Sequence, residues 1–165
     1  MPYKKILSDN SNLIFGPRAI AKRGNGFEFQ LNSKKDKHNL RANLIYLSSD
    51  REFDKRYPSH KNIGDQRWGY EIKSSSDLQL GILNVNWADF SDFHFFRDVP
   101  GESVNLNYQR EEYFEQSISF QGSFKKLSYE LGSMGFESSN PILTNGYVKK
   151  PFICLLYTSE PTRPL

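Results

Sequence analysis

The chain has 165 residues, the length of one domain, and its 15% aromatic content argues against intrinsic disorder. The formal charge of +3 is mild, and the basic residues occur as doublets between apolar runs, so nucleic-acid binding is not predicted. No run approaches the ~18 apolar residues that a membrane helix needs. The low mean hydropathy of -0.66 still allows a transmembrane barrel, because barrel strands turn only alternate residues to lipid.

Period-2 alternation of apolar residues predicts an all-β chain. The predicted strands cover about 12–21, 26–33, 38–47, 67–73, 78–90, 113–124 and 127–137, and an eighth begins at Tyr147. The second of these is the cleanest, since Phe27, Phe29 and Leu31 alternate with polar residues. In the fifth, the parity of the apolar positions shifts near Ile82, which indicates a β-bulge.

The connections between the predicted strands alternate in length after the first hairpin. The short ones are 34–37, 74–77 and 125–126, the long ones are 48–66 and 91–112, and 138–146 is intermediate. Outer-membrane barrels show this asymmetry, with tight periplasmic turns and long outward loops. A soluble antiparallel sandwich with uneven loops fits the same pattern about equally well.

Aromatic residues favour the barrel slightly. Those near predicted strand ends are Trp68, Tyr70, Trp87, Tyr113 and Phe114. Interfacial girdles of membrane barrels occupy such positions. The rival is a soluble β-sandwich that binds carbohydrate through exposed aromatic side chains such as Trp68 and Trp87. A third alternative is another outer-membrane barrel, such as a porin or a receptor.

The last part of the chain matches a laboratory sequence. Residues 154–159 are what the mosaic end of a transposase sequencing adapter encodes in one reading frame, and 160–163 match the next part of that adapter. An in-frame match of this length is improbable by chance, so we interpret 154–165 as a library scar and 1–153 as a partial barrel domain. The alternative is a natural C-terminal strand over Cys-Leu-Leu-Tyr-Thr. We therefore expect few contacts from 154–165 and draw no redox conclusion from Cys154.

The stretch 67–98 contains Arg-Trp-x-Tyr, then Asn-x-Asn-Trp, then Ser-Asp-x-x-Phe-Phe-x-Asp. This pattern resembles the outer-membrane barrel of the lipopolysaccharide-assembly protein LptD family. Weaker similarities to the same family occur in 15–24, 44–51 and 113–124. They run in order through almost all of 2–153, and this collinearity strengthens the resemblance.

The resemblance implies an open antiparallel β-meander of about seven or eight strands, the N-terminal third of a barrel with on the order of two dozen strands. It places the protein in the cell outer membrane, as a fragment of a translocon that inserts lipopolysaccharide into the outer leaflet. A lipoprotein would plug the barrel, and periplasmic bridge proteins would supply the lipid. No enzymatic chemistry, cofactor or nucleic-acid partner is implied. Residues 2–6 look like the family's segment that leads into the barrel.

In this family the first strand pairs with the last and forms a lateral gate. The resemblance assigns the gate to Gly16, Pro17 and Arg18. Pro17 cannot donate a ladder hydrogen bond, so it weakens strand pairing locally. A second family proline is matched here by Ser8. A proline tolerated on an edge strand explains Pro17 equally well.

Alternation then assigns side chains to two faces, because a lipid-facing Arg or Lys at the bilayer midplane costs ~2–4 kcal/mol. The residues predicted to face the lumen are Glu28, Gln30, Asn84, Asn86, Ser117 and Ser119. Those predicted to face lipid are Phe27, Phe29, Leu31, Leu83, Val85, Trp87, Phe114, Ile118 and Phe120.

Other polar clusters carry weaker signals. Asp50, Glu52 and Asp54 could ligate a divalent cation or serve in acid–base chemistry, but the basic residues within 51–56 favour a solvated, salt-bridged surface. The histidines have no ligand-like spacing, so no metal site is predicted. The acidic and aromatic residues of 92–98 form either an ordinary loop cluster or a cover packed over the lumen.

Overall fold

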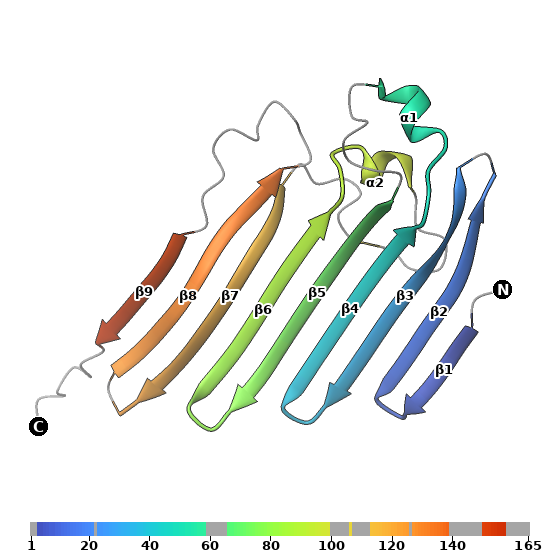
Figure 1. Ribbon diagram of the computed structural model, residues 1–165. Coiled ribbons are helices and arrows are strands. Elements are labelled where there is room, and N and C mark those ends of the chain that lie inside the picture. The colour runs from blue at the N-terminus through green and yellow to red at the C-terminus, as the bar shows by residue number, and fades with distance from the viewer. Residues whose placement is uncertain are drawn as a thin grey trace, which may run out of the picture.

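The computed structural model describes residues 3–21, 23–58, 66–99, 106, 113–125, 127–138 and 150–157. Their strands form one antiparallel sheet in chain order, so the predicted all-β open meander is confirmed (Figure 1). The strands are β1 Tyr3–Ser8, β2 Ser11–Ile20, β3 Gly24–Lys35, β4 His38–Leu47, β5 Arg67–Leu78, β6 Gly81–Phe90, β7 Tyr113–Phe124, β8 Leu127–Ser138 and β9 Lys150–Tyr157. Two short helices, α1 Phe53–Arg56 and α2 Phe95–Asp98, lie in the long connections.

The sheet has nine strands, one more than predicted, because β1 is a strand and not only a lead-in segment. It pairs with the lower part of β2, from the Tyr3–Phe15 pair to the Ser8–Ser11 pair, with an irregularity near Ile6. The strand predicted to be first in the sheet, β2, is therefore paired with β1 from Ser11 as far as Phe15.

Each connection at the lower end of the sheet in Figure 1 is a two-residue turn between paired strand ends, as in the Lys35–His38 and Phe124–Leu127 pairs. The turn residues Asp36 and Lys125 have positive φ values of 30° and 55°. This backbone region supplies the twist that tight hairpins need. Longer connections lie at the upper end, so the predicted alternation of short and long connections is confirmed.

The β5–β6 hairpin differs from the prediction. The turn expected at 74–77 is wrong, since β5 continues to Leu78 and pairs there with Gly81. Serine favours turns, but here the Ser75 hydroxyl donates to Asn84 Oδ1 across the hairpin at 2.8 Å. The register is uninterrupted, so the bulge expected near Ile82 is wrong as well. The shift in the alternation of apolar residues near Ile82 instead reflects the turn between Leu78 and Gly81.

The expectation of few contacts after residue 153 is wrong for the first four residues. β9 pairs with β8 from Met134–Lys150 to Leu127–Tyr157, and so includes 154–157. Residues 158–165 lie outside the described part of the chain. A strand edge pairs through backbone groups, which every residue except proline offers in full, so this pairing leaves the adapter origin of the segment untested.

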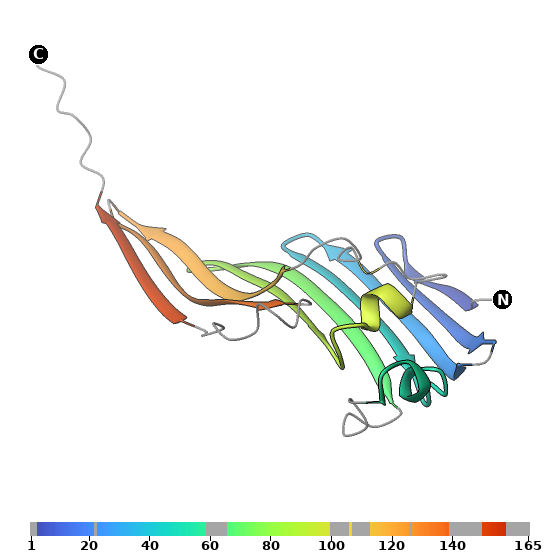
Figure 2. The same cartoon turned by 90° about the horizontal axis from the view of Figure 1, so that it is seen from above.

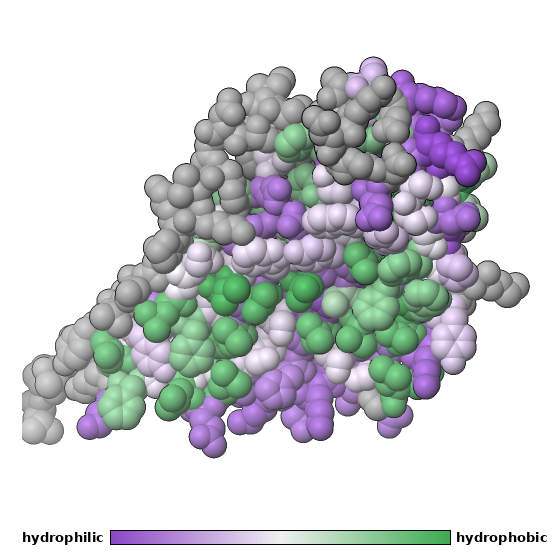
Figure 3. Space-filling view, in the orientation of Figure 1, coloured by the Kyte–Doolittle hydropathy of each residue, from purple (hydrophilic) through white to green (hydrophobic). Residues whose placement is uncertain are grey.

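The sheet has two unlike faces. On one face apolar and aromatic residues line up across strands, as in the row Leu31, Ala42, Ile72 and Trp87. Figure 3 shows this apolar face turned to the viewer, with a band of hydrophobic side chains running across several strands. Figure 2 shows that the sheet is curved, with α2 on its concave side.

The buried core lies on the concave face, where α2 and its loop cover the upper strand ends. Its members are Ile45, Leu47, Ala88, Phe90, Phe95, Phe96, Val99, Leu106 and Phe114. Close approach requires a glycine at this point, because a Cβ on Gly69 would lie 2.4 Å from the Phe95 ring. The glycine of the Arg-Trp-Gly-Tyr motif therefore admits α2 onto the sheet.

Phe114 was predicted to face lipid, and this is wrong. Its side chain is fully buried, stacks on Phe96 at 4.8 Å between centroids and packs against Phe90 at 5.0 Å. The β6–β7 pairing ends at Asn86–Ser117, and above that pair Gln116 Nε2 donates instead to the backbone carbonyl of Ala88 at 2.8 Å. The upper end of β7 thus turns its Phe114 side chain into the loop cluster.

Candidate functional site: the polar face and its loop cover

The six residues predicted to face the lumen share one face of the sheet. Asn84 pairs with Ser119 and Asn86 with Ser117, and the register continues this face through β5 and β4 to the even-numbered residues of β3, which include Glu28 and Gln30. We call it the polar face. The residues predicted to face lipid lie on the opposite, apolar face, apart from Phe114. That the polar face bounds a lumen stays a prediction.

Away from the loops, the polar face carries mainly neutral amides and hydroxyls that bond across strands. Asn32 Nδ2 donates to Asn12 Oδ1 at 3.1 Å, and the Ser75–Asn84 bond lies on the same face. The same face also carries ionic groups, such as the Lys73–Glu71 pair in the middle of β5, at 3.1 Å. These groups offer hydrogen-bond donors and acceptors to a hydrated or hydroxyl-rich ligand.

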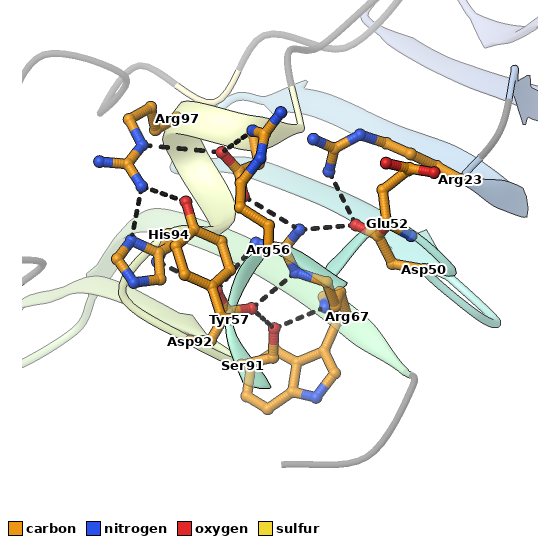
Figure 4. Close-up of polar contacts among 12 residues, drawn as sticks. Arg23, Asp50, Glu52, Arg56, Tyr57, Arg67, Ser91, Asp92, His94 and Arg97 are labelled. Carbon is orange, nitrogen blue, oxygen red and sulfur yellow. Dashed lines mark hydrogen bonds and ion pairs between the residues drawn. The ribbon is translucent and has the colours of Figure 1, made fainter. Parts of the chain in front are cut away.

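At the loop end, Arg67 is the centre of a buried ion-pair network (Figure 4). Its side chain has no exposed surface. The guanidinium binds Asp92 through two parallel hydrogen bonds, Nε to Oδ2 and Nη2 to Oδ1, both 2.8 Å long. Nη1 donates to Asp50 Oδ2 at 2.6 Å and lies 3.6 Å from Asp98 Oδ2. Such a forked pair fixes orientation as well as charge.

The carboxylates come from connections far apart in the sequence. Asp50 follows β4, whereas Asp92 and Asp98 follow β6. Asp50 Oδ2 also accepts from Arg23 Nη1 at 2.8 Å, which ties the β2–β3 connection to the same network. Arg67 itself begins β5. The network therefore joins three connections of the upper end to one strand.

Asp50 and Asp92 also shape their own loops. Asp50 Oδ1 accepts from the backbone N–H of Glu52 at 3.2 Å, and Asp92 Oδ1 accepts from that of His94 at 3.0 Å. Each carboxylate thereby forms an Asx-type turn just before a short helix. The prediction of a solvated surface is wrong for Asp50, which is buried, because Arg67 lies beneath it.

Aromatic rings flank the guanidinium. The Arg67 Cζ atom lies 4.4 Å from the centroid of Phe53 in α1 and 5.8 Å from that of Phe95 in α2. A planar cation between rings gains cation–π attraction where water is excluded. Since an arginine does not lose its proton in proteins, Arg67 is a fixed cation that ties α1 and α2 to the beginning of β5.

Of the two interpretations of 92–98, the cover packed on the sheet describes the structure. Asp92, Phe95, Phe96 and Asp98 all lie against the concave face. The central role of Arg67 was missed. The only signal in the sequence was an arginine at the first position of a strand and acidic residues after two other strands. Whether these side chains come into contact depends on the order of the strands in the sheet.

The predicted gate residues lie in β2 above its pairing with β1. Pro17 is opposite Phe27 on the apolar face, and the last β1 pair is Tyr3–Phe15. Arg18 points to the polar face, is nearly buried and forms an ion pair with Glu28 at 2.9 Å. Arg18 therefore lies on the polar face, and the assignment of all three residues to a gate stays a prediction.

No protein-family model and no curated protein matches the chain. Among the described residues, no group of three or more His, Cys, Asp or Glu side chains could hold a metal ion. No helix in the described part of the chain is long and apolar enough to span a membrane. The features that bear on function are therefore the two faces of the sheet and the loop cover.

Proposed function

We propose that this chain is part of an outer-membrane barrel of the LptD family, which inserts lipopolysaccharide into the outer leaflet through a lateral gate. The observation that carries the proposal is a single curved sheet with a continuous apolar convex face and a polar concave face, joined by tight turns at one end and long loops at the other. Transmembrane barrels combine these features.

The convex face has the side chains that a bilayer requires. Neighbouring aromatic rings follow one another across its upper part, with Phe15 5.8 Å from Phe27, and Phe27 5.3 Å from Tyr46. Trp68, which pairs with Tyr46, stacks on Tyr70 at 5.7 Å. An aromatic row near the loop end fits an interfacial girdle. The bilayer core would then lie toward the short turns.

The concave face would guide the hydrophilic part of lipopolysaccharide. Its neutral amides and hydroxyls can exchange hydrogen bonds with sugar hydroxyls as the lipid moves past. The buried loop cover would close the outer end of this path. In this proposal a plug lipoprotein fills the remaining lumen, and periplasmic bridge proteins deliver the lipid at the turn end.

The lateral gate would involve Gly16, Pro17 and Arg18. Pro17 offers no backbone N–H, and β1 does not reach it among the described residues. The seam above Phe15 would thus open at a lower cost than a fully paired strand.

The soluble sandwich fits less well, since the described strands form one sheet and no second sheet covers the apolar face. In a sandwich, the two inner faces pack about 10 Å apart. A porin or receptor barrel would have the same two faces. The transported molecule must therefore distinguish these possibilities from the proposed lipopolysaccharide translocon.

Photo-cross-linking in Gram-negative cells would identify the molecule that moves along the polar face. A photoreactive residue in place of Asn86, on the polar face, is expected to capture lipopolysaccharide. The matched control at Val85 is next in sequence but on the apolar face, and it should capture phospholipid instead. Equal capture of lipopolysaccharide at both positions, or none at Asn86, would argue against an export path along this face.

A further inference from the structure

We propose that the short-turn end of the sheet is a docking surface for anionic phospholipid headgroups; this rests on the proposed function, because it assumes that the apolar face meets a bilayer. We call this surface the basic rim. It consists of the exposed lysines Lys34, Lys35, Lys37 and Lys125 and of the apolar residues Leu78, Leu80, Phe124 and Leu127.

The apolar members of the basic rim are unusually exposed for their size. Leu80, in the β5–β6 turn, is 74% exposed, and Phe124, at the end of β7, is 66% exposed. The β5–β6 turn is held in place, because Tyr129 donates its hydroxyl proton to the Leu80 carbonyl. The exposed side chains are therefore presented by an anchored hairpin, and solvent is a poor environment for them.

Cationic groups stand beside these apolar tips. Lys125 Nζ lies 5.4 Å from the centroid of the Phe124 ring. Lys34 and Lys35 end β3, whose hairpin with β4 lies next to the β5–β6 hairpin that carries Leu80. Figure 3 shows hydrophilic side chains below the hydrophobic band of the same face. Apolar tips with lysines at their edge match the boundary between acyl chains and headgroups, where lysine stems lie along apolar surface and their ammonium groups reach the phosphates.

The two ends of the sheet use their cations differently. At the loop end Arg23 and Arg67 are committed to buried carboxylates. At the short-turn end, among the described residues, only Lys37 of the rim lysines has a carboxylate within ion-pair distance, Asp77 at 3.8 Å, and both are exposed. Lys34, Lys35 and Lys125 thus keep their charge available for an external anion.

The occupant we infer is the phosphate of an anionic glycerophospholipid. A negatively charged leaflet attracts each nearby lysine by an amount equivalent to roughly fivefold in binding. Phosphates of lipopolysaccharide carry the same charge and also stand beside acyl chains. In the proposed function, however, lipopolysaccharide enters the outer leaflet, whereas the short turns of a membrane barrel lie on the periplasmic side, at the leaflet of glycerophospholipid.

The test uses the full 165-residue chain, diluted from detergent into preformed vesicles of phosphatidylcholine, with or without phosphatidylglycerol. Trp68 and Trp87, the only tryptophans, report binding by fluorescence. The double variant K34S/K35S is expected to bind phosphatidylglycerol vesicles about 25-fold more weakly, with no change on phosphatidylcholine alone. The matched control R51S/K55S removes two exposed charges at the loop end and should match the parent chain.

Three outcomes would overturn the rim proposal: unchanged binding of K34S/K35S, an equal loss on both vesicle types, or an equal loss in the control. Lysine-dependent binding to lipopolysaccharide micelles without any phosphatidylglycerol dependence would overturn it in favour of the other phosphate source. A parent chain that binds both vesicle types equally would overturn the rim proposal alone. A parent chain that binds neither vesicle type would show that the proposed membrane function itself fails.

Discussion

Replacing Arg67 by alanine is expected to lower the free energy of unfolding by about 3–5 kcal/mol, because it leaves the buried Asp92 carboxylate without its counter-charge and leaves Asp50 with Arg23 alone. Asp50 and Asp92 are both almost completely shielded from solvent in the present fold. They cannot regain water unless the long loops leave the concave face. We therefore expect R67A to release α1 and α2 and to make the loops sensitive to protease while the strands below remain paired.

Urea unfolding in detergent micelles, followed by tryptophan fluorescence, would measure this loss. The variant D92N, which breaks the forked pair, should cost more than D98N, whose carboxylate is 3.6 Å from Arg67. The control K55A removes a largely exposed pair with Glu52 at 3.3 Å and should change stability by less than about 1 kcal/mol. Equal effects of R67A and K55A would show that the buried network is unimportant for holding the loops.

The second large effect is expected from a charge on the apolar face. F29R places a guanidinium in the middle of β3 on the face that we assign to lipid, and should cost about 2–4 kcal/mol in a bilayer. The next residue offers the matched control, since Q30R puts the same group on the polar face. We expect Q30R to fold in phospholipid vesicles nearly as well as the parent chain.

The comparison is made by measuring the folded fraction of both variants across a urea series in the same vesicles. The difference should shrink in detergent-free buffer, where the apolar face has no hydrocarbon partner. If F29R and Q30R are equally stable in vesicles, the apolar face does not contact lipid.

The strands could be predicted because their signal is local. Alternation at Phe27, Phe29 and Leu31 needs only neighbouring residues, and the structure places all three on one face. The β5–β6 turn was misplaced because Ser75 prefers turns on its own but gains a cross-strand partner in Asn84. Whether such a residue adopts a turn or a strand is decided by its partner on the neighbouring strand, and the local sequence gives no information about that partner.

The loop cover could not be predicted from local pattern, because its contacts join segments that only the finished sheet brings together. Alternation placed Phe114 on the lipid side, although the end of the β6–β7 pairing turns it inward. Asp50 read as a solvated loop residue because Arg67, its buried partner, begins the next strand. The two faces of the sheet follow from the period-2 alternation of side chains, whereas the ion-pair network at its loop end follows from the order of the strands.

The most direct test of the central claim, that the apolar face meets lipid and the polar face meets water, is thiol labelling in vesicles. The chain has one cysteine, so a C154S background allows single cysteines at Gln30 and Asn86 on the polar face and at Leu44 and Val85 on the apolar face. A membrane-impermeant maleimide is predicted to label the first two and spare the second two. Equal labelling of both pairs, or labelling of the apolar pair alone, would contradict the account.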